Sequence, residues 1–324
     1  MEHIESITQI PGIFTAHATN AKAGTGCTVI VCPKGATGAV DVRGGAPATR
    51  ETDLLRPEET VQTLNAIVLS GGSAYGLAAS CGVAEELERH GIGLDVGVGV
   101  VPIVSGACVF DLACGDPHVR PTAEDGARAA RLALEDAGEP LARGNVGAGT
   151  GCTVGKLGGP ERAMKGGLGE DVEVAGALVC GAVAVVNACG DVVDPTTGTP
   201  IAGIRTTDGT ALASSDEELL SLTAQMPLDR RANTTISCVV TNARLTKAQA
   251  TKVAQMAADA YAHAIRPTHT TNDGDTVFVM ATGEIGAQVD LVGVLATRAL
   301  ERAIADGARS ATGAYGLPAA RDLA

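Results

Sequence analysis

The chain has 324 residues, of which 45% are hydrophobic and only 2% aromatic, and its formal net charge at pH 7 is −13. Because 24 Lys and Arg face 37 Asp and Glu, the surface lacks the basic excess that a nucleic-acid partner requires. The sequence contains no run of about 20 apolar residues, the length that a membrane-spanning helix needs. We therefore expect a globular protein without a nucleic-acid or membrane partner, located in the cytoplasm because its acidic opening does not resemble a signal peptide.

The cysteines and glycines indicate how the core is built. Nine cysteines are present, an odd number, and most lie among Val, Ala and Gly without C-x-x-C spacing. We expect them to be reduced and buried as small hydrophobic residues. The 42 glycines predict close backbone packing and tight turns in place of large rings.

Apolar periodicity predicts strands and helices along the whole chain. Runs rich in β-branched residues predict strands at 27–32, 66–70, 177–187 and 235–241. Amphipathic patterns predict helices at 73–90, 122–137, 246–264 and 289–306. The first of these helices should bury a stripe of Leu77, Cys81, Ala84 and Leu87. Residues 206–232, rich in turn-forming and charged residues, read as a linker.

This arrangement favours an α/β (α+β) fold rather than a doubly wound one. The strands are interspersed with helices but show no regular βαβ period, so we expect sheets packed face to face and flanked by helices.

Standard active-site motifs are missing from the sequence. Neither G-x-S-x-G nor H-E-x-x-H occurs, and the six histidines are scattered, so neither a Ser-His-Asp triad nor a metal site is predicted. The glycine run SGGSAYG at 70–76 follows a strand and starts a helix, where a phosphate-binding loop would lie. It lacks the lysine of a P-loop and the third glycine of a dinucleotide site, so close strand-to-helix packing is the favoured interpretation.

The segment RANTTISCVVTNAR, residues 231–244, places Thr234 where the linker meets a strand. A hydroxyl at this boundary can attack the carbonyl of Asn233, and hydrolysis of the resulting ester would free the α-amine of Thr234. An α-amine titrates near pH 8, so it can act as the general base for the hydroxyl of the same residue. Taken alone, the local sequence favours a plainer alternative, a strand that starts with β-favouring threonines.

A second polar segment, HTTNDGDTVFVMATGE at 269–284, carries two carboxylates before a strand. Asp273 and Asp275 are separated by one glycine and can orient a nucleophile and transfer its proton. A polar turn or a calcium-type loop is the alternative, although the ligand pattern of an EF-hand is not met.

Several segments, in order along the chain, resemble the S58 peptidase family. They are DVRGGAPATRETDLL (41–55), LSGGSAYGL (69–77), VPIVSGACVFDL (101–112), GNVGAGTGCTVGKLGGPERAMKGGLG (144–169), AVVNACGDVVDP (184–195), NTTIS and DGDT. The family contains L-aminopeptidase/D-esterases, β-peptidyl aminopeptidases and 6-aminohexanoate-oligomer hydrolases. A more remote similarity links the chain to ornithine acetyltransferases.

The resemblance implies a four-layer αββα sandwich. It also implies that the chain cleaves itself into a large and a small fragment. The large α region would cover residues 1–233 and the small β region residues 234–324. The family also implies assembly into homotetramers and chemistry that needs no cofactor.

The resemblance also implies roles for five residues. Cleavage would fall between Asn233 and Thr234, with Thr234 as the nucleophile. Asp273 and Asp275 match the acidic pair of the nylon-oligomer branch, and Asn187 matches the asparagine that helps to stabilise the oxyanion.

Two further roles are not assigned to a single residue. Lys156 matches the lysine near the nucleophile, but Lys165 competes for that place. Phe110 stands where the nylon-oligomer branch has a functional tyrosine, and Tyr75 is the candidate to replace its hydroxyl.

Phe110 and Tyr75, together with Gly71 and Gly72, are the candidates for the substrate pocket. The expected function is an autoprocessing hydrolase that acts on small amides or peptides through an acyl-Thr234 intermediate. The alternatives are an acyltransferase, in which an amine resolves the same intermediate, and a member that binds small molecules without catalysis.

Overall fold

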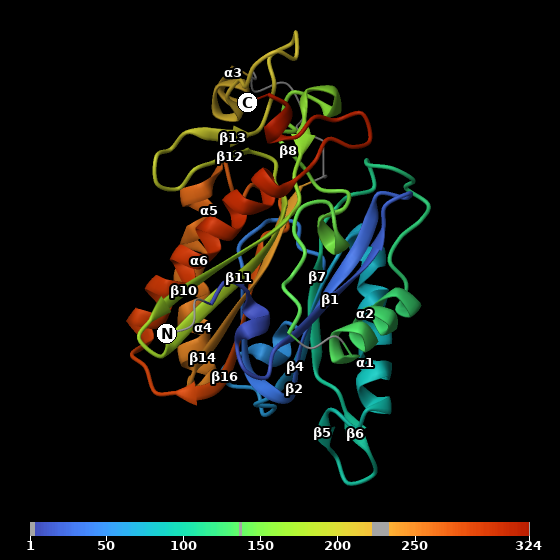
Figure 1. Cartoon of the computed structure of the whole chain (residues 1–324), viewed down its shortest axis with the longest axis vertical. Helices are drawn as coiled ribbons and strands as arrows, with labels where there is room; N and C mark the ends of the chain where they lie inside the picture. The colour runs from blue at the N-terminus through green and yellow to red at the C-terminus, as the bar shows by residue number, and fades with distance from the viewer. Residues whose placement is uncertain (1–3, 136–137, 222–232, 324) are drawn as a thin grey trace.

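A large mixed sheet forms the centre of the molecule. The computed structural model describes residues 4–135, 138–221 and 233–323 (Figure 1). Nine strands pair in the order β10-β11-β14-β16-β2-β4-β7-β3, with β1 added beside β2. The bounds are β1 Phe14–Asn20, β2 Thr25–Val42, β3 Thr49–Arg50, β4 Leu64–Ser70, β7 Val104–Cys108, β10 Leu168–Ala175, β11 Leu178–Asn187, β14 Thr234–Ala243 and β16 Thr276–Ile285.

Strand β2 joins the two halves of this sheet. Its first part, residues 25–31, pairs with β1 and β4, and its last part, residues 37–42, pairs with β16. Most of β2 and all of β4, β11 and β14 are buried, which agrees with the nearly continuous apolar runs of the sequence.

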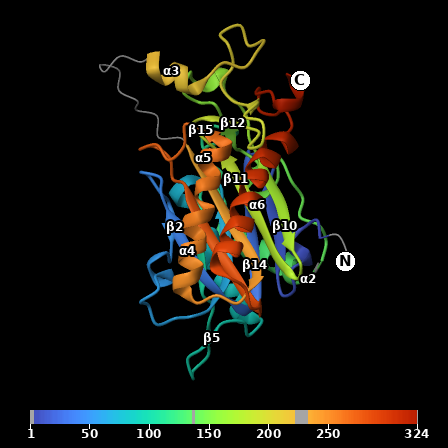
Figure 2. The ribbon, with the colours of Figure 1, turned by 90° about the vertical axis from the view of Figure 1, so that its left-hand side faces the viewer.

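Helices cover both faces of the sheet. On one face α4, α5 and α6 pack against β10, β11, β14 and β16, and on the other α1 and α2 pack against β1, β2 and β4 (Figures 1 and 2). A third apolar core lies between the two halves of the sheet and contains Ile30, Ile67, Val183, Ile236 and Phe278. The helix bounds are α1 Ala78–Arg89, α2 Ala123–Glu135, α3 Ser215–Ser221, α4 Lys247–Ala257, α5 Asp259–Ala264 and α6 Val289–Ser310.

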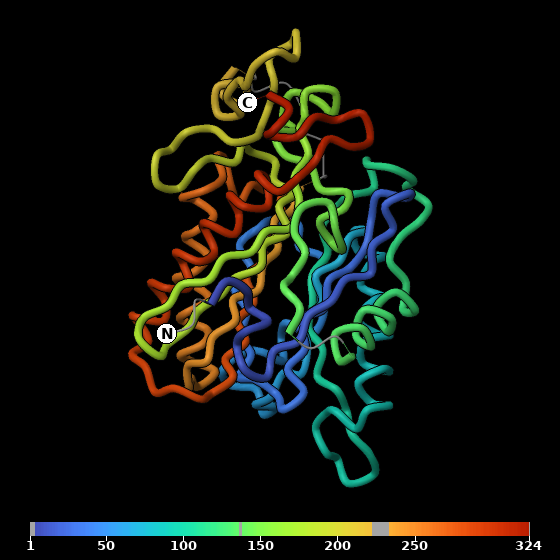
Figure 3. Tube along the Cα trace, in the orientation of Figure 1, coloured from blue at the N-terminus to red at the C-terminus, as the bar shows by residue number. Residues whose placement is uncertain are grey.

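Short strands build the end of the molecule at which the C-terminal segment finishes. This segment, red in Figure 3, returns to the hairpin β8–β9, where the backbone nitrogen of Lys165 donates to the carbonyl of Pro318 at 2.8 Å. The short strands at this end are β8 Thr153–Val154, β9 Met164–Lys165, β12 Asp191–Val193, β13 Pro200–Ala202 and β15 Ile265–Arg266. Two others, β5 Leu94–Asp95 and β6 Val100–Val101, pair at the opposite end of the molecule (Figure 1).

The predicted strands and helices are confirmed, with different bounds. The strand expected at 27–32 is the first part of β2, and the helix expected at 246–264 is divided into α4 and α5. Residues 222–232 of the expected linker lie outside the described residues, and its earlier part contains α3. No helix in the described ranges is long and apolar enough to cross a membrane.

One predicted buried stripe is wrong. The helix expected at 73–90 begins with a 3-10 turn at Ser73–Leu77, and the α-helix starts only at Ala78. A 3-10 turn has about three residues per turn instead of 3.6, so the inward face shifts to Ala79, Val83 and Leu87. Cys81 is consequently exposed, whereas the other eight cysteines are buried as expected.

Candidate active site

Three strand ends meet at one edge of the sheet and carry the predicted site residues. Thr234 is the first residue of β14, and it lies opposite Asn187, the last residue of antiparallel β11. Strand β16 runs parallel to β14 and starts at Thr276. Since parallel strands begin at the same edge, the Asp273–Asp275 segment reaches the start of β14. Segments that are distant in sequence are thereby brought together around Thr234.

The side chain of Thr234 lies beside the peptide bond that the sequence marks for cleavage. Thr234 is buried, with 4% of its surface exposed, and its Oγ1 donates a hydrogen bond to the carbonyl oxygen of Asn233. The hydroxyl is therefore within reach of the carbonyl that it would attack.

Gly274 leaves the space that this hydroxyl occupies. A Cβ on Gly274 would lie 3.0 Å from Thr234 Oγ1 and 3.0 Å from the carbonyl oxygen of Ala46. A glycine between the two aspartates thus lets the loop approach the nucleophile closely.

Asn187 and Lys156 form a polar group on the other side of Thr234. Lys156 Nζ donates to the backbone oxygen of Asn187 at 2.8 Å and to its Oδ1 at 3.0 Å. The backbone nitrogen of Thr153 also donates to this Oδ1, at 2.9 Å. Because Oδ1 accepts these two bonds, the amide nitrogen of Asn187 points away from Lys156 and donates to the carbonyl of Phe110 at 2.9 Å. The orientation of the amide is therefore fixed.

The structure brings Lys156, and not Lys165, to this group. Burial of the Lys156 amine lowers its pKa to about 8, because a charged amine is disfavoured away from water. Lys165 is also buried, but its amine donates to the carbonyls of Thr150 and Cys152 at 3.0 and 2.6 Å. Lys165 therefore holds the backbone beneath the site.

Asp275 is held by four hydrogen bonds. Its Oδ1 accepts from the backbone nitrogen of Thr235 at 2.8 Å. Its Oδ2 accepts from the backbone nitrogen and ring Nδ1 of His269, at 3.0 and 2.9 Å, and from Thr268 Oγ1 at 3.2 Å. A carboxylate with this many donors is fixed in position.

Asp273 has a different environment. Its Oδ2 accepts hydrogen bonds from the backbone nitrogen and the hydroxyl of Thr270, at 2.8 and 2.6 Å. Burial, and secondly the neighbouring charge of Asp275, raise the pKa of Asp273 to about 6. Asp273 can therefore bind and release a proton near neutral pH.

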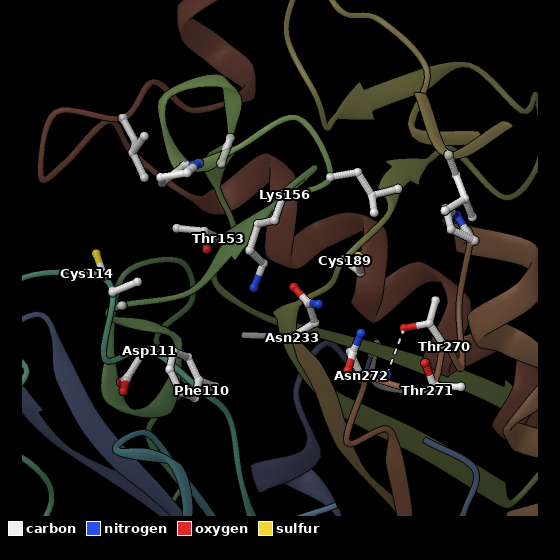
Figure 4. Close-up of a pocket in the computed structure, with 18 residues that line it drawn as sticks. Phe110, Asp111, Cys114, Thr153, Lys156, Cys189, Asn233, Thr270, Thr271 and Asn272 are labelled. Atoms are coloured by element: carbon white, nitrogen blue, oxygen red, sulfur yellow. Dashed lines mark hydrogen bonds between the residues drawn. The ribbon is translucent and has the colours of Figure 1, made fainter. Parts of the chain in front are cut away.

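A cavity of about 740 Å³ opens onto this edge of the sheet (Figure 4). Its lining includes Phe110, Thr153, Lys156 and Asn233, and the loop of residues 270–272. Most of the other lining residues are small or apolar. A volume of this size suits a small organic molecule or a short peptide.

The glycines expected in the pocket do not line this cavity. A Cβ on Gly71 would lie 2.0 Å from Oδ2 of Asp111. The carboxylate of Asp111 accepts from the backbone nitrogen of Gly72 and from Thr25 Oγ1, each at 2.6 Å. Gly71 and Gly72 therefore serve close packing, the interpretation that the local sequence favoured.

Of the two aromatic candidates, only Phe110 lines the cavity. Tyr75 is 63% exposed, and the guanidinium of Arg120 lies 4.1 Å from the centre of its ring. Tyr75 therefore does not supply the hydroxyl that Phe110 lacks.

Sequence reasoning missed one residue of this group, His269. The histidines are scattered along the chain, but His269 lies in the same HTTNDGDT segment as the two aspartates. Its short separation from Asp275 was the signal that could have identified it. Across the residues that the structure describes, no group of three or more His, Cys, Asp or Glu side chains could hold a metal ion.

The chain is similar in sequence to proteins described as aminopeptidases and as 6-aminohexanoate-oligomer hydrolases. It is 45% identical over 298 residues to an uncharacterized aminopeptidase of Mycobacterium leprae, covering 88% of this chain and 80% of that protein. It is 39% identical to an uncharacterized aminopeptidase of Mycobacterium tuberculosis, covering 99% and 98% of the two chains. A 6-aminohexanoate-oligomer endohydrolase of a Kocuria species is 30% identical, covering 85% and 74%.

Solved structures of two aminopeptidases have the same overall fold as this chain. A β-aminopeptidase of a Burkholderia species superposes with a TM-score of 0.68 at 20% identity, covering 99% of this chain and 92% of that one. The L-aminopeptidase/D-Ala-esterase/amidase of Ochrobactrum anthropi, described as a variant of the Ntn hydrolase fold, gives a TM-score of 0.68 at 16% identity, covering 96% and 88%. The model of peptidase family S58 matches residues 5–319, so the chain belongs to this family and is a hydrolase that acts on amide bonds.

Proposed function

We propose that this chain cuts itself between Asn233 and Thr234 and that the freed Thr234 then hydrolyses small amides or peptides. The observation that carries this proposal is the position of the Thr234 hydroxyl. It is hydrogen-bonded to the carbonyl of Asn233, at a strand end where Asn187 and the two aspartates also lie.

The first reaction is an acyl shift followed by hydrolysis. Oγ1 of Thr234 attacks the carbonyl carbon of Asn233 and loses its proton, and we assign Asp273 as the acceptor because its pKa is raised to about 6. The C–N bond then breaks, the nitrogen of Thr234 becomes an amine by gaining a proton, and Asn233 is left as an ester on Oγ1. Water hydrolyses this ester and leaves Asn233 as a free carboxylate.

We assign the stabilisation of the charged intermediates to Lys156, which Asn187 holds in place. Asn187 lies opposite Thr234 across the strand pair, and the buried ammonium of Lys156 is bonded to Oδ1 of Asn187. Fixed donors in a buried site stabilise a developing oxyanion and need little reorganisation. With a pKa near 8, Lys156 is still mostly charged at neutral pH.

Turnover of a substrate would use the new α-amine of Thr234. That amine accepts the hydroxyl proton as Oγ1 attacks the substrate carbonyl, the substrate amine leaves, and water resolves the acyl-enzyme. We infer a peptide or another linear amide as the substrate, because the relatives are described as aminopeptidases and as oligomer hydrolases of 6-aminohexanoate.

We also infer the four-layer αββα arrangement, which is supported by the apolar core between the two halves of the sheet. A functional division into residues 1–233 and 234–324 follows from the proposed cleavage. Homotetramers and a cytoplasmic location remain predictions from the resemblance and the composition.

The test is the intact mass of the purified protein and of the variant Thr234→Ala. Wild type should yield two fragments that separate before Thr234, whereas Thr234→Ala should stay at about 32.4 kDa. Thr235→Val is the matched control, because the Thr235 hydroxyl is buried and has no hydrogen-bond partner among the described residues, and it should still be cleaved. A folded wild type that stays whole on prolonged incubation would refute the proposal.

A further inference from the structure

We infer that His269 is a positioning residue that holds Asp275, and through it the start of strand β14, in the geometry that self-cleavage requires. This inference rests on the proposed function. Four observations carry it: the hydrogen bonds from His269 to Asp275, the isolation of the second ring nitrogen, the contact with Tyr261 and the hydrogen bond from Thr235 to Asp275.

His269 holds the carboxylate of Asp275 from two directions. Its backbone nitrogen and its ring Nδ1 both bond to Oδ2, at 3.0 and 2.9 Å. A carboxylate only accepts, so Nδ1 carries the hydrogen of this bond. The side chain of Asp275 is only 3% exposed, so water does not readily replace a missing donor.

The second ring nitrogen of His269 has no onward contact in the described part of the chain. Nε2 is buried, and within these residues it has no hydrogen-bond partner. A proton relay needs a partner at each nitrogen of the imidazole, so the hydrogen-bonded chain ends at this ring. His269 is also absent from the residues that line the cavity. A role in orientation fits these facts, and a role in direct proton transfer does not.

Tyr261 fixes the plane of the imidazole. The two rings stack with their centres 5.2 Å apart and their planes 29° apart. The single hydrogen of the Tyr261 hydroxyl is shared between the carbonyl oxygens of Thr235 and Thr276, which lie 3.0 and 3.1 Å from the hydroxyl oxygen. The same tyrosine therefore holds β14 and β16 together and supports the histidine that bonds to Asp275.

The effect reaches Thr234 through one peptide unit. The other oxygen of Asp275, Oδ1, accepts from the backbone nitrogen of Thr235 at 2.8 Å. A rotation of the carboxylate would release this nitrogen, and Thr234 is the preceding residue. Since small misplacements of a reacting group slow a reaction strongly, loss of the imidazole bond should slow self-cleavage.

The backbone conformation at His269 decides which variants are informative. Its φ is +54°, a left-handed value that glycine adopts freely and that asparagine and aspartate tolerate better than most residues. His269→Gly and His269→Asn therefore both accommodate the backbone. Only asparagine restores a side-chain donor, because its amide nitrogen is attached to Cγ as Nδ1 is.

The experiment follows self-cleavage over time on denaturing gels, beginning with newly translated wild type, His269→Gly and His269→Asn. We expect the glycine variant to be cleaved about 10- to 100-fold more slowly, the loss that one hydrogen bond to a charged group produces. The asparagine variant should recover most of the wild-type rate. His263→Ala is the control, because His263 makes a similar Nδ1 contact at 2.7 Å to Glu301 on the surface, and its rate should not change.

The outcomes separate this inference from the proposed function. If wild type is cleaved and the glycine variant is cleaved equally fast, or if glycine and asparagine variants are equally slow, the positioning role is wrong and the proposed function stands. If wild type is folded but never cleaved, both fail. Should the glycine variant not fold, His269→Ala, which keeps a Cβ but has no side-chain donor and no charge, takes its place with the same expectation.

Discussion

Replacement of Asp273 by asparagine should stabilise the uncleaved protein while it removes the proton acceptor. The pKa of Asp273 is raised from 3.8 to about 6 by burial and by Asp275. The folded state therefore binds this proton more tightly than the unfolded state does. The unfolding free energy then falls as the pH rises from about 4 to 6. Above pH 6 the full destabilisation by the ionised Asp273 is present. A shift of about two units corresponds to a cost of up to about 3 kcal/mol.

An asparagine at this position avoids that cost and keeps the local contacts. Its amide oxygen can still accept from the backbone nitrogen and hydroxyl of Thr270, which now bond to Oδ2. At pH 8 we expect the unfolding free energy to rise by about 1 to 3 kcal/mol. At pH 4, where aspartic acid is itself largely protonated, the difference should nearly vanish.

The assay compares urea unfolding of Thr234→Ala with that of Thr234→Ala/Asp273→Asn at several pH values. Both proteins carry the alanine, so neither is cut and both unfold from the same uncleaved state. A stability difference that does not depend on pH would refute the reasoning, as would a double variant that is less stable at pH 8. In the presence of Thr234, Asp273→Asn alone should slow self-cleavage by at least about 100-fold.

Three further substitutions test separate parts of the structure. Lys156→Met should slow self-cleavage by about 100- to 1,000-fold, measured on gels, because a donor to the developing oxyanion is lost. Gly274→Ala should slow it by about tenfold or more, because the added Cβ would lie 3.0 Å from Thr234 Oγ1. Lys247→Met should lower the unfolding free energy by about 2 to 4 kcal/mol, because the buried amine of Lys247 donates to three backbone carbonyls at 2.9 to 3.1 Å.

Matched controls exist for two of these substitutions. A Cβ on Gly286 would meet no other atom of the described residues within 4 Å, and the φ of Gly286 is not left-handed, so Gly286→Ala should be cleaved as wild type is. Lys252 lies on the same helix as Lys247 but is less buried, so Lys252→Met should leave stability unchanged. Equal effects in a variant and its control would contradict the assignment of the contact.

The sequence allowed most of the fold elements to be predicted because local patterns determine them. The buried strands β4 and β11 are mostly apolar runs, β14 is rich in β-branched residues, and the capping box at Thr246 marks the start of α4. The bounds of β2 could not be predicted, because its second half contains polar residues and glycines that are tolerated only through pairing with β16. Pairing between distant strands leaves no local signal.

The site was predictable in composition but not in contacts. Local chemistry made Thr234 and the aspartates candidates but favoured a plain strand start for Thr234, and the resemblance supported them and added Asn187 and Lys156. The choice between Lys156 and Lys165 depends on which amine reaches Asn187, and that depends on how the β8–β9 hairpin folds. The exposure of Tyr75 likewise follows from the 3-10 turn that precedes α1, a detail that apolar spacing does not reveal.

The proposed reaction needs Lys156 and Asp273 in their charged forms, and these are the forms that lower the stability of the folded protein. Burial lowers the pKa of Lys156 to about 8, and burial with Asp275 raises that of Asp273 to about 6. Between these values both groups are charged, and each charged form is the one that burial disfavours. These two residues therefore lower the unfolding free energy of the uncleaved protein most near pH 7. In this pH range a charged lysine and an unprotonated aspartate are both present, as the reaction requires. Self-cleavage should accordingly be fastest between about pH 6 and 8, and a rate that rises without limit above pH 9 would show that Lys156 acts without its charge.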